Sequence, residues 1–451
     1  MRRIYNLEIK DLEELTLPMM SFFPSMALMA AVGLAPIAGA RAAEQPLPAM
    51  EQLQRLRDGM RLAHEGGDAT SYLNNARSAH AFLNGSPQSI LQLMSAEVFA
   101  GKQDDALGSF EQFVRMGQSN EAALSAKQFD AIRAGERYGT IHAAMAANNA
   151  SLSTASKLFE LTDQSLVPED IDYDATTQLF YITSVLKKAI LAVDMHGSTR
   201  VFAAAPGGWP MMAVKVDSRH RLLWATEVAL DGYVQTSPKD WGKSVIDIYD
   251  LATGKLLHRV EGPAHTALGD MTLTADGDAI VSDGEHGGVY RVRRVSRQIE
   301  RLDGGGFISP QTPIVLPDGR HIMVPDYLRG IGVLDLESKH VAWLSMEGRH
   351  ALSGIDGLYL VGNALLATQN GTSPERVVRF ELDASLEHVA SESIIERATP
   401  TLGDPTHGVV IGTRFCYIAN SGWDALDDHG NIQAGKTLSP GLIMCTDLGK
   451  H

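Results

Sequence analysis

The sequence of 451 residues predicts an all-β six-bladed propeller preceded by a small α-helical, tetratricopeptide-like domain. Two observations predict this fold. From Met50 to about Asn148, apolar residues recur at spacings of three and four, as they do on one face of a helix. From Leu166 to Leu448, a unit of about 40 residues with several short strands recurs about six times, which is typical of a propeller.

The first 43 residues are interpreted as a signal peptide or an N-terminal anchor. Leu15 to Ala40 carry no charge, and Ala40-Arg41-Ala42 offers an Ala-x-Ala cleavage pattern. A retained anchor is the alternative, because about 20 apolar residues span a bilayer, but Pro24 and Pro36 make this a poor permanent span. We therefore expect a periplasmic or secreted protein that has no contact with a membrane beyond its leader.

Residues 49–150 form the predicted helical domain. Asp68-Ala69-Thr70 and Ser86-Pro87 are typical helix starts. Leu91–Met116 resembles a tetratricopeptide repeat, in which two helices meet through small residues, here Ala96 and Ala106. One such repeat is fewer than a stable solenoid needs. We expect a small domain packed beside the propeller, with a peptide-binding groove as the alternative.

Residues 155–451 form the predicted propeller, with blades at 166–194, 209–260, 268–302, 310–345, 354–396 and 405–448. The last blade has only three good strands, although a blade needs four. Ser156–Leu161 alternates apolar and polar residues, as a half-buried strand does. We expect it to pair with Leu442–Thr446 and close the ring, which would remove an exposed sheet edge.

The two cysteines, Cys416 and Cys445, fall on neighbouring predicted strands of the last blade. Two buried thiols are the expectation, because cysteine is among the most buried residue types. A cross-strand disulfide is the alternative in an oxidising compartment. The chain has no Cys-x-x-Cys pair, which excludes a zinc ribbon or a thioredoxin-type site.

The formal net charge of −15 excludes a nucleic-acid partner, because no cluster of Lys or Arg offsets the acidic body. The sequence also lacks Gly-x-Ser-x-Gly, a phosphate-binding loop with its Lys, and His-Glu-x-x-His. These absences exclude the common serine-hydrolase, nucleotide-binding and zinc-protease motifs.

The repeats resemble the senescence-marker-protein/gluconolactonase superfamily of six-bladed propellers, over about residues 155–448. The resemblance rests on four segments: Pro168-Glu169-Asp170-Ile171-Asp172-Tyr173-Asp174, Pro325-Asp326-Tyr327-Leu328-Arg329-Gly330-Ile331, Gly354-Ile355-Asp356-Gly357-Leu358-Tyr359 and Asp404-Pro405-Thr406-His407-Gly408. It implies a metal-dependent lactonase or esterase that acts on a small-molecule lactone or ester. The superfamily also holds non-catalytic proteins, so whether this chain is an enzyme stays open.

In the lactonases of this family, a divalent metal, calcium or zinc, sits in the channel on a glutamate, an asparagine and an aspartate. Carried over, the glutamate matches Glu169 and the aspartate matches Asp356, which would be metal ligand and general base together. The asparagine has no match, and Gln311 or Thr312 stands near its position. Either could give one neutral oxygen ligand.

Other channel candidates come from the ends of strands. Asp270 opens the third blade and is a further candidate ligand; His407 opens the sixth and could be a base, a ligand or a structurally satisfied histidine. The structural alternative for Glu169 and Asp356 is that they accept hydrogen bonds from blade turns. Polar residues that end second strands are expected to cap turns: Asp283, Asp326, Asn370 and Asn420. Three tryptophans could line a pocket or only pack: Trp209, Trp241 and Trp423.

The leading hypothesis is therefore an exported metal-dependent hydrolase with its site in the channel. The alternative is a non-catalytic propeller that binds a protein or a small ligand, with the helical domain as its contact surface.

Overall fold

The computed structural model describes residues 47–346 and 349–449. The predicted leader, residues 1–43, lies outside this part of the chain. Within the described residues, no helix is both long and apolar enough to cross a membrane.

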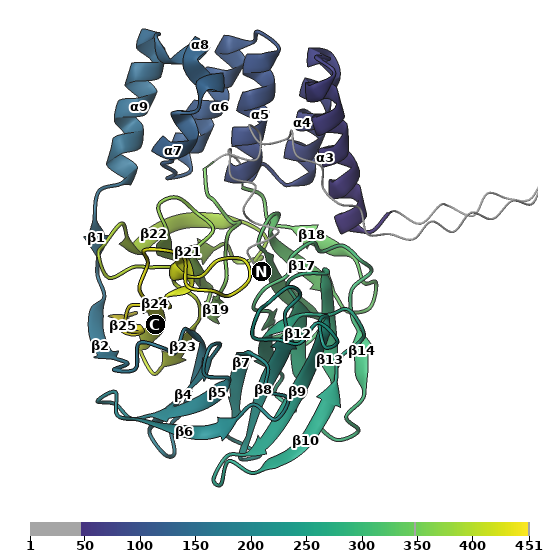
Figure 1. The fold of residues 1–451 in the computed structure, drawn as a ribbon, viewed down its shortest axis with the longest axis vertical. Coiled ribbons are helices and arrows are strands. Elements are labelled where there is room, and N and C mark those ends of the chain that lie inside the picture. Colours follow the sequence, from purple (N-terminus) through teal and green to yellow (C-terminus); the bar gives the residue numbers. More distant parts are fainter. Residues whose placement is uncertain (1–46, 347–348, 450–451) are drawn as a thin grey trace, which may run out of the picture.

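The helices come first in the chain and stand side by side along one side of the propeller (Figure 1). Their bounds are α3 (Ala49–Glu65), α4 (Ala69–Phe82), α5 (Pro87–Phe99), α6 (Gln103–Arg115), α7 (Glu121–Leu124), the 3-10 helix η1 (Lys127–Phe129), α8 (Asp130–Arg133) and α9 (Glu136–Asn148).

Both predicted helix starts are confirmed. Asp68 is the N-cap of α4 and accepts a hydrogen bond from the backbone N of Ser71 over 3.0 Å. Pro87 is the first residue of α5, where its missing N–H costs nothing. In α5 and α6 the predicted small residues Ala96 and Ala106 are both fully buried.

Six antiparallel sheets follow and form the predicted six-bladed propeller. In blade order the strands are β3 (Pro168–Asp174), β4 (Leu179–Ser184), β5 (Ala189–Val193) and β6 (Thr199–Ala204); β7 (Met211–Asp217), β8 (Leu222–Ala229), β9 (Lys243–Asp250) and β10 (Leu256–Glu261); β11 (Leu268–Leu273), β12 (Ala279–Asp283), β13 (Gly288–Val292) and β14 (Ile299–Arg301); β15 (Ile314–Val315), β16 (His321–Asp326), β17 (Gly330–Asp335) and β18 (Val341–Trp343); β19 (Leu358–Val361), β20 (Ala364–Gln369), β21 (Arg376–Leu382) and β22 (Val389–Arg397); β23 (Gly408–Ile411), β24 (Arg414–Asn420) and β25 (Leu442–Asp447). Each blade has one innermost strand, and contacts between neighbouring innermost strands run around the channel; these strands are β3, β7, β11, β15, β19 and β23.

The ring closes as predicted. β2 (Ser156–Glu160) pairs antiparallel with β25 and supplies the fourth strand of the last blade. Just before it, β1 (Leu152–Ser153) adds a fifth strand to the fifth blade by pairing with β22. The first predicted blade ended too early, at residue 194, because its outer strand β6 is exposed or half-exposed throughout and has no apolar pattern.

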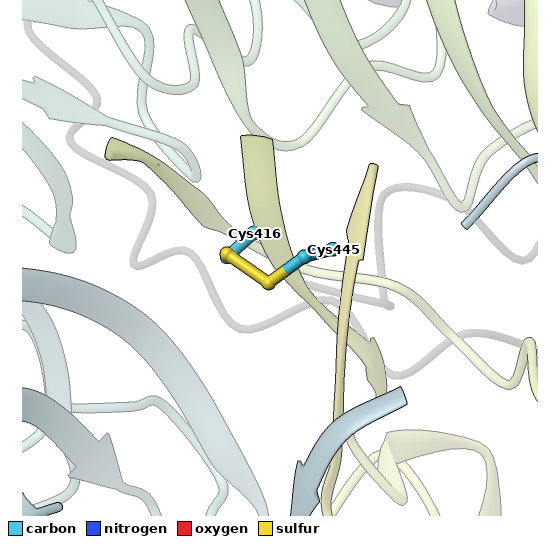
Figure 2. Close-up of a disulfide and its surroundings, with 2 residues drawn as sticks. All are labelled: Cys416 and Cys445. Atoms are coloured by element: carbon cyan, nitrogen blue, oxygen red, sulfur yellow. A yellow bond between two sulfur atoms is a disulfide. The ribbon is translucent and has the colours of Figure 1, made fainter. Parts of the chain in front are cut away.

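Cys416 and Cys445 lie directly opposite each other on β24 and β25 and form a disulfide, with their Cα atoms 4.0 Å apart (Figure 2). The expected pair of free thiols is therefore wrong, and the alternative is confirmed. Register decides between the two, because only residues in opposed positions bring their Cβ atoms within bonding reach.

Three contacts fix the helices to the loops of the fourth and fifth blades. The amide nitrogen of Gln88, at the start of α5, donates to the main-chain oxygen of Gly371 over 2.7 Å. Ser119 and Ser373 exchange hydrogen bonds. Arg329 donates to the main-chain oxygen of Phe82 over 3.1 Å. These propeller loops join second to third strands, and the same loops border the channel pocket described next.

Candidate functional site

The innermost strand of the first blade delivers Glu169 to the channel at a break in its pairing with β4. The register shifts around Glu169 and Asp170, so both lie in a β-bulge, which re-aims side chains that would otherwise alternate between faces. Both carboxylates are buried. Asp170 turns to the second blade, where its Oδ2 accepts from Val214 N and from Lys215 Nζ, over 2.8 and 2.6 Å. Glu169 lines a pocket at the mouth of the channel.

Asp356 lies in the turn that leads into β19, the innermost strand of the fifth blade. Gly354 begins this turn at a φ of +67°, and a Cβ there would lie 2.6 Å from the backbone of Gly371. Only glycine fits such a conformation and approach. The turn brings Asp356 to the same pocket as Glu169, with 6% of its surface exposed.

Each of the two acids is held by a donor from another strand end. Asn370, just after β20, donates from Nδ2 to Asp356 Oδ2 over 2.9 Å, and its own Oδ1 accepts from the hydroxyl of Tyr327 over 2.9 Å. The indole N–H of Trp423 donates to Glu169 Oε2. These bonds fix the rotamers of both carboxylates, which line the pocket.

The spacing of these groups suits a divalent metal. One side-chain ligand atom from each of Glu169, Asp356 and His407 lies within 4.8 Å of the others. Two oxygens that share a calcium ion at about 2.3–2.6 Å each are at most about 5 Å apart. The two carboxylates therefore meet the distance requirement for a shared hard cation, and a divalent metal can be accommodated between them.

His407 occupies a different position from the one a general base needs. Its Nδ1 lies 2.9 Å from the main-chain oxygen of Glu169, and its Nε2 contacts Oδ1 of Asp270. Both partners are acceptors, so both ring nitrogens carry hydrogen and the ring is an imidazolium. Burial lowers the pKa of His407, but the charges of Asp170 and Asp270 outweigh burial and raise it well above its usual value. The geometry favours the structurally satisfied histidine among the three predicted roles.

Asp270, Thr312 and His407 are buried and are not among the residues that line the pocket, whereas Gln311 lines it. The Thr312 hydroxyl is 3.0 Å from Asp270 Oδ1 and 3.0 Å from the main-chain oxygen of Asp356. It therefore ties the fourth blade to the third and fifth. Gln311 directs its amide nitrogen to the hydroxyl of Ser309, 3.0 Å away. Of the predicted neutral ligands, Gln311 is thus the one that reaches the pocket.

Glu169 and Asp356 are both buried, and the pKa of each carboxyl group is raised. Burial raises the pKa of Glu169 well above its usual range, and the charge of Asp356 raises it further. Burial also raises the pKa of Asp356, against the opposing effect of the His407 charge. A cation between them would remove both penalties, because it favours the ionised form of each.

Besides the earlier candidates Trp423 and Asn370, the pocket includes residues that the sequence did not identify. The loop between β8 and β9 supplies Leu230, Asp231 and Tyr233. The loop between β24 and β25 supplies Trp423, Asp427 and Asp428. The remaining walls are Glu285, Tyr327, Asn370 and Asp404. Loop residues follow no period, so the signal that could have found them was the length of these two loops, since functional side chains often lie on long loops over a rigid scaffold.

Two of the four polar residues that end second strands, Asp283 and Asp326, cap turns as expected. Asp283 accepts from the backbone N of Ala267, Glu285 and His286. Asp326 accepts from four backbone N–H groups of the fourth blade. Asn370 instead donates to Asp356. Of the three tryptophans, Trp423 lines the pocket and Trp209 and Trp241 do not.

No family model matches this chain, and no curated protein matches its sequence. Its structure is similar to a gluconolactonase from Xanthomonas campestris, with 15% identity over 67% of this chain and 93% of that one, at a TM-score of 0.45. It is similar to the calcium-binding protein regucalcin from Agrobacterium tumefaciens, with 15% identity, 66% and 95% coverage and a TM-score of 0.46. A catalytically inactive virginiamycin B lyase from Staphylococcus aureus matches with 15% identity, 65% and 98% coverage and a TM-score of 0.42.

Proposed function

We propose that this protein is an exported, divalent-metal-dependent hydrolase of lactones or esters. One observation carries the proposal: Glu169 and Asp356, from the first and fifth blades, bring ligand atoms within 4.8 Å of each other in one pocket. None of the described residues that line this pocket is Lys, Arg or His, and the nearby imidazolium of His407 gives its ring hydrogens to Asp270 and to the backbone of Glu169, so no described cation is bound to either carboxylate. Buried, facing carboxylates without such a partner are costly unless a metal or a proton joins them.

Glu169 and Asp356 would hold the metal, and Gln311, which lines the same pocket, would add a neutral oxygen. A calcium or zinc ion there would polarise the substrate carbonyl and lower the pKa of a water molecule. Asn370 and Trp423 would keep the two carboxylates in position, and the imidazolium of His407 would hold Asp270 and the Glu169 backbone in place.

Asp356 would also act as the base. Its carboxylate would take a proton from the water that adds to the carbonyl carbon. The ester C–O bond would then break, and the departing alkoxide would take up that proton. Only the ionised form of Asp356 can do this, and its donor Asn370 favours that form, because the bond goes to the charged oxygen.

Export is supported by the disulfide of the last blade, because such bonds persist in oxidising compartments. The uncharged segment near the start of the chain supports the same conclusion.

The test is a panel of lactones and phenyl esters, with and without chelator, on wild type and three variants. We expect Asp356→Asn to abolish hydrolysis and Glu169→Gln mainly to weaken metal binding, measured by calorimetric titration of calcium and zinc. The control is Asp276→Asn, which removes an exposed carboxylate in a turn away from the pocket and should match wild type. If metal-loaded wild type hydrolyses nothing, or if chelator leaves hydrolysis unchanged, the proposal is wrong.

The alternative, a binding propeller that uses its helices as a contact surface, has one observation in its favour. Leu62 on α3 and Phe99 at the end of α5 are 60% and 40% exposed, and the Phe99 ring touches His64. This function becomes the better one if the purified protein binds no metal and the variants above leave all measured properties unchanged.

A further inference from the structure

We propose that the outer part of the pocket binds its substrate through a primary or secondary ammonium group, so that the compound hydrolysed is an amino ester or an amino lactone. The inference rests on the hydrolase function proposed above and names its substrate class. Three features of the pocket carry it: its charge, its aromatic walls and one buried hydroxyl group.

The pocket carries far more negative charge than a single metal needs. Seven of its thirteen lining residues are Asp or Glu. A divalent cation on Glu169 and Asp356 would neutralise two of them, and five acids would still face the pocket. A cleft lined by one sign of charge concentrates ligands of the opposite sign. A neutral or anionic ester gains nothing from these carboxylates, whereas an ammonium group does.

Aromatic rings share the same walls. Tyr233, Tyr327 and Trp423 line the pocket together with the acids. A cation over the face of an aromatic ring is attracted by the quadrupole of the ring, and more strongly when both are desolvated. Carboxylates combined with aromatic rings suit an organic ammonium group with its apolar carbon chain better than they suit a hydrated metal ion.

The buried hydroxyl of Tyr233 is a second, independent indication that a ligand binds here. Tyr233 is 3% exposed, and its Oη has no hydrogen-bond partner among the described residues. Tyr233 lines the same pocket as Glu169 and Asp427, and burial, followed by the charges of these two acids, raises its pKa. A buried hydroxyl without a partner destabilises the folded protein, because it has lost its hydrogen bonds to water. An ammonium N–H that donates to Oη would satisfy it.

This wall is built as one unit from two distant loops. His429 accepts a backbone hydrogen bond from Val234 over 2.9 Å, and its Nδ1 donates to the main-chain oxygen of Gly232 over 2.9 Å. The backbone of Gly430 lies against the ring of Tyr233, because a Cβ there would be 2.2 Å from it. The loops of the second and sixth blades therefore hold Tyr233 beside Asp427 and Asp428 before any substrate arrives.

The experiment measures binding without turnover, by calorimetry on the metal-loaded full chain with hexylammonium, hexan-1-ol and tetramethylammonium. We expect hexylammonium to bind at least about tenfold more tightly than hexanol at low salt. Tyr233→Phe should weaken hexylammonium about five- to tenfold and leave tetramethylammonium within about twofold, because only the former donates an N–H. The double variant Asp231→Asn with Asp428→Asn should weaken both cations, and Asp276→Asn should weaken neither.

A kinetic arm separates this inference from the hydrolase proposal. Phenyl 6-aminohexanoate should be hydrolysed with a kcat/KM at least about tenfold above that of phenyl hexanoate. Added salt should reduce this ratio, because it screens the attraction between the ammonium group and the carboxylates. If neutral and cationic esters react equally and hexylammonium binds no better than hexanol, the ammonium site is wrong and the hydrolase stands. If hexylammonium binds selectively but neither ester reacts, the hydrolase is wrong and the ammonium site stands. If a second equivalent of calcium fills the outer acids and hexylammonium does not bind, the outer site is a metal site and the inference is overturned.

Discussion

The carboxylate of Asp356 is held by the side-chain amide of Asn370, whose Nδ2 lies 2.9 Å from Oδ2. Asn370 is itself held by the hydroxyl of Tyr327 from the neighbouring blade, over 2.9 Å. A chain of two hydrogen bonds thus runs from the fourth blade to the acid that we propose as ligand and base. Such outer partners orient a ligand and tune its basicity.

The first prediction concerns this chain. Asn370→Ala should lower kcat/KM for ester hydrolysis and the affinity for the metal by about 10- to 100-fold, because Asp356 loses the donor that favours its ionised form. Tyr327→Phe, which removes only the outer bond, should have a smaller effect in the same direction. Steady-state kinetics and calcium titration measure both. Wild-type values for Asn370→Ala would mean that Asp356 needs no orienting partner.

Much of the fold could be predicted because each half-buried strand of a blade shows a local alternation of apolar and polar residues. The alternating segment Ser156–Leu161 was enough to place the strand that closes the ring, since a three-stranded last blade left an open edge for it. The outer strand Thr199–Ala204 escaped prediction because a strand that buries neither face has no period to detect. The disulfide stayed undecided because strand register, which depends on bulges such as the one near Asn420, cannot be read from spacing.

The site divides in the same way. Glu169 and Asp356 became candidates through the family resemblance, whose motifs match the segments Pro168–Asp174 and Gly354–Tyr359. The roles of Asp270 and His407 could not be separated from metal binding, because only coordinates show that each faces the other. Tyr233 and Asp428 come from loops without periodicity, and a fold-level resemblance says nothing about such loops.

The second prediction concerns pH. Burial raises the pKa of Glu169 to about 8 and that of Asp356 to about 7, whereas both are near 4 in the unfolded chain. The folded state then binds more protons than the unfolded state between about pH 4 and 8, so stability falls as pH rises through this window. In the presence of chelator, the apparent Tm should drop from pH 6 to pH 8.5, and it should drop less in Glu169→Gln. Calcium should oppose the drop, because it binds the ionised carboxylates. An equal drop in wild type and variant would show that other groups control it.

The third prediction concerns the disulfide between Cys416 and Cys445, which closes a loop across 29 residues of sequence. Chain-entropy arguments give about 3–4 kcal/mol of stabilisation for a loop of this size. The double variant Cys416→Ala with Cys445→Ala should therefore unfold at a lower urea concentration than wild type. A reductant should destabilise wild type but leave the stability of the double variant unchanged. β2 pairs with β25, the strand that carries Cys445. The loss of stability in the double variant should therefore appear first as faster hydrogen exchange of the backbone amides of residues 156–160. If exchange speeds up equally in all blades, the disulfide acts on the unfolded chain alone.

The last prediction concerns how the helices support the pocket. The guanidinium of Arg329 lies between the rings of Phe82 and Trp343, 4.3 and 4.2 Å from their centroids, and donates to main-chain oxygens of Phe82 and Gly306 over 3.1 and 2.7 Å.

Arg329→Ala should cost about 2–4 kcal/mol, because a partly buried cation loses two rings and two acceptors at once. Arg329→Lys should recover little, since an ammonium cannot stack and reach both oxygens. The matched control is Arg320→Ala, whose side chain is 55% exposed beside Asp335 and should cost less than about 1 kcal/mol. Tyr327 is two residues from Arg329 on the same loop, so kcat/KM should also fall in Arg329→Ala and not in the control. Hydrogen exchange across residues 82–88 measures the docking directly: if protection there is unchanged while stability falls, Arg329 serves the propeller alone and the helices do not support the pocket through it.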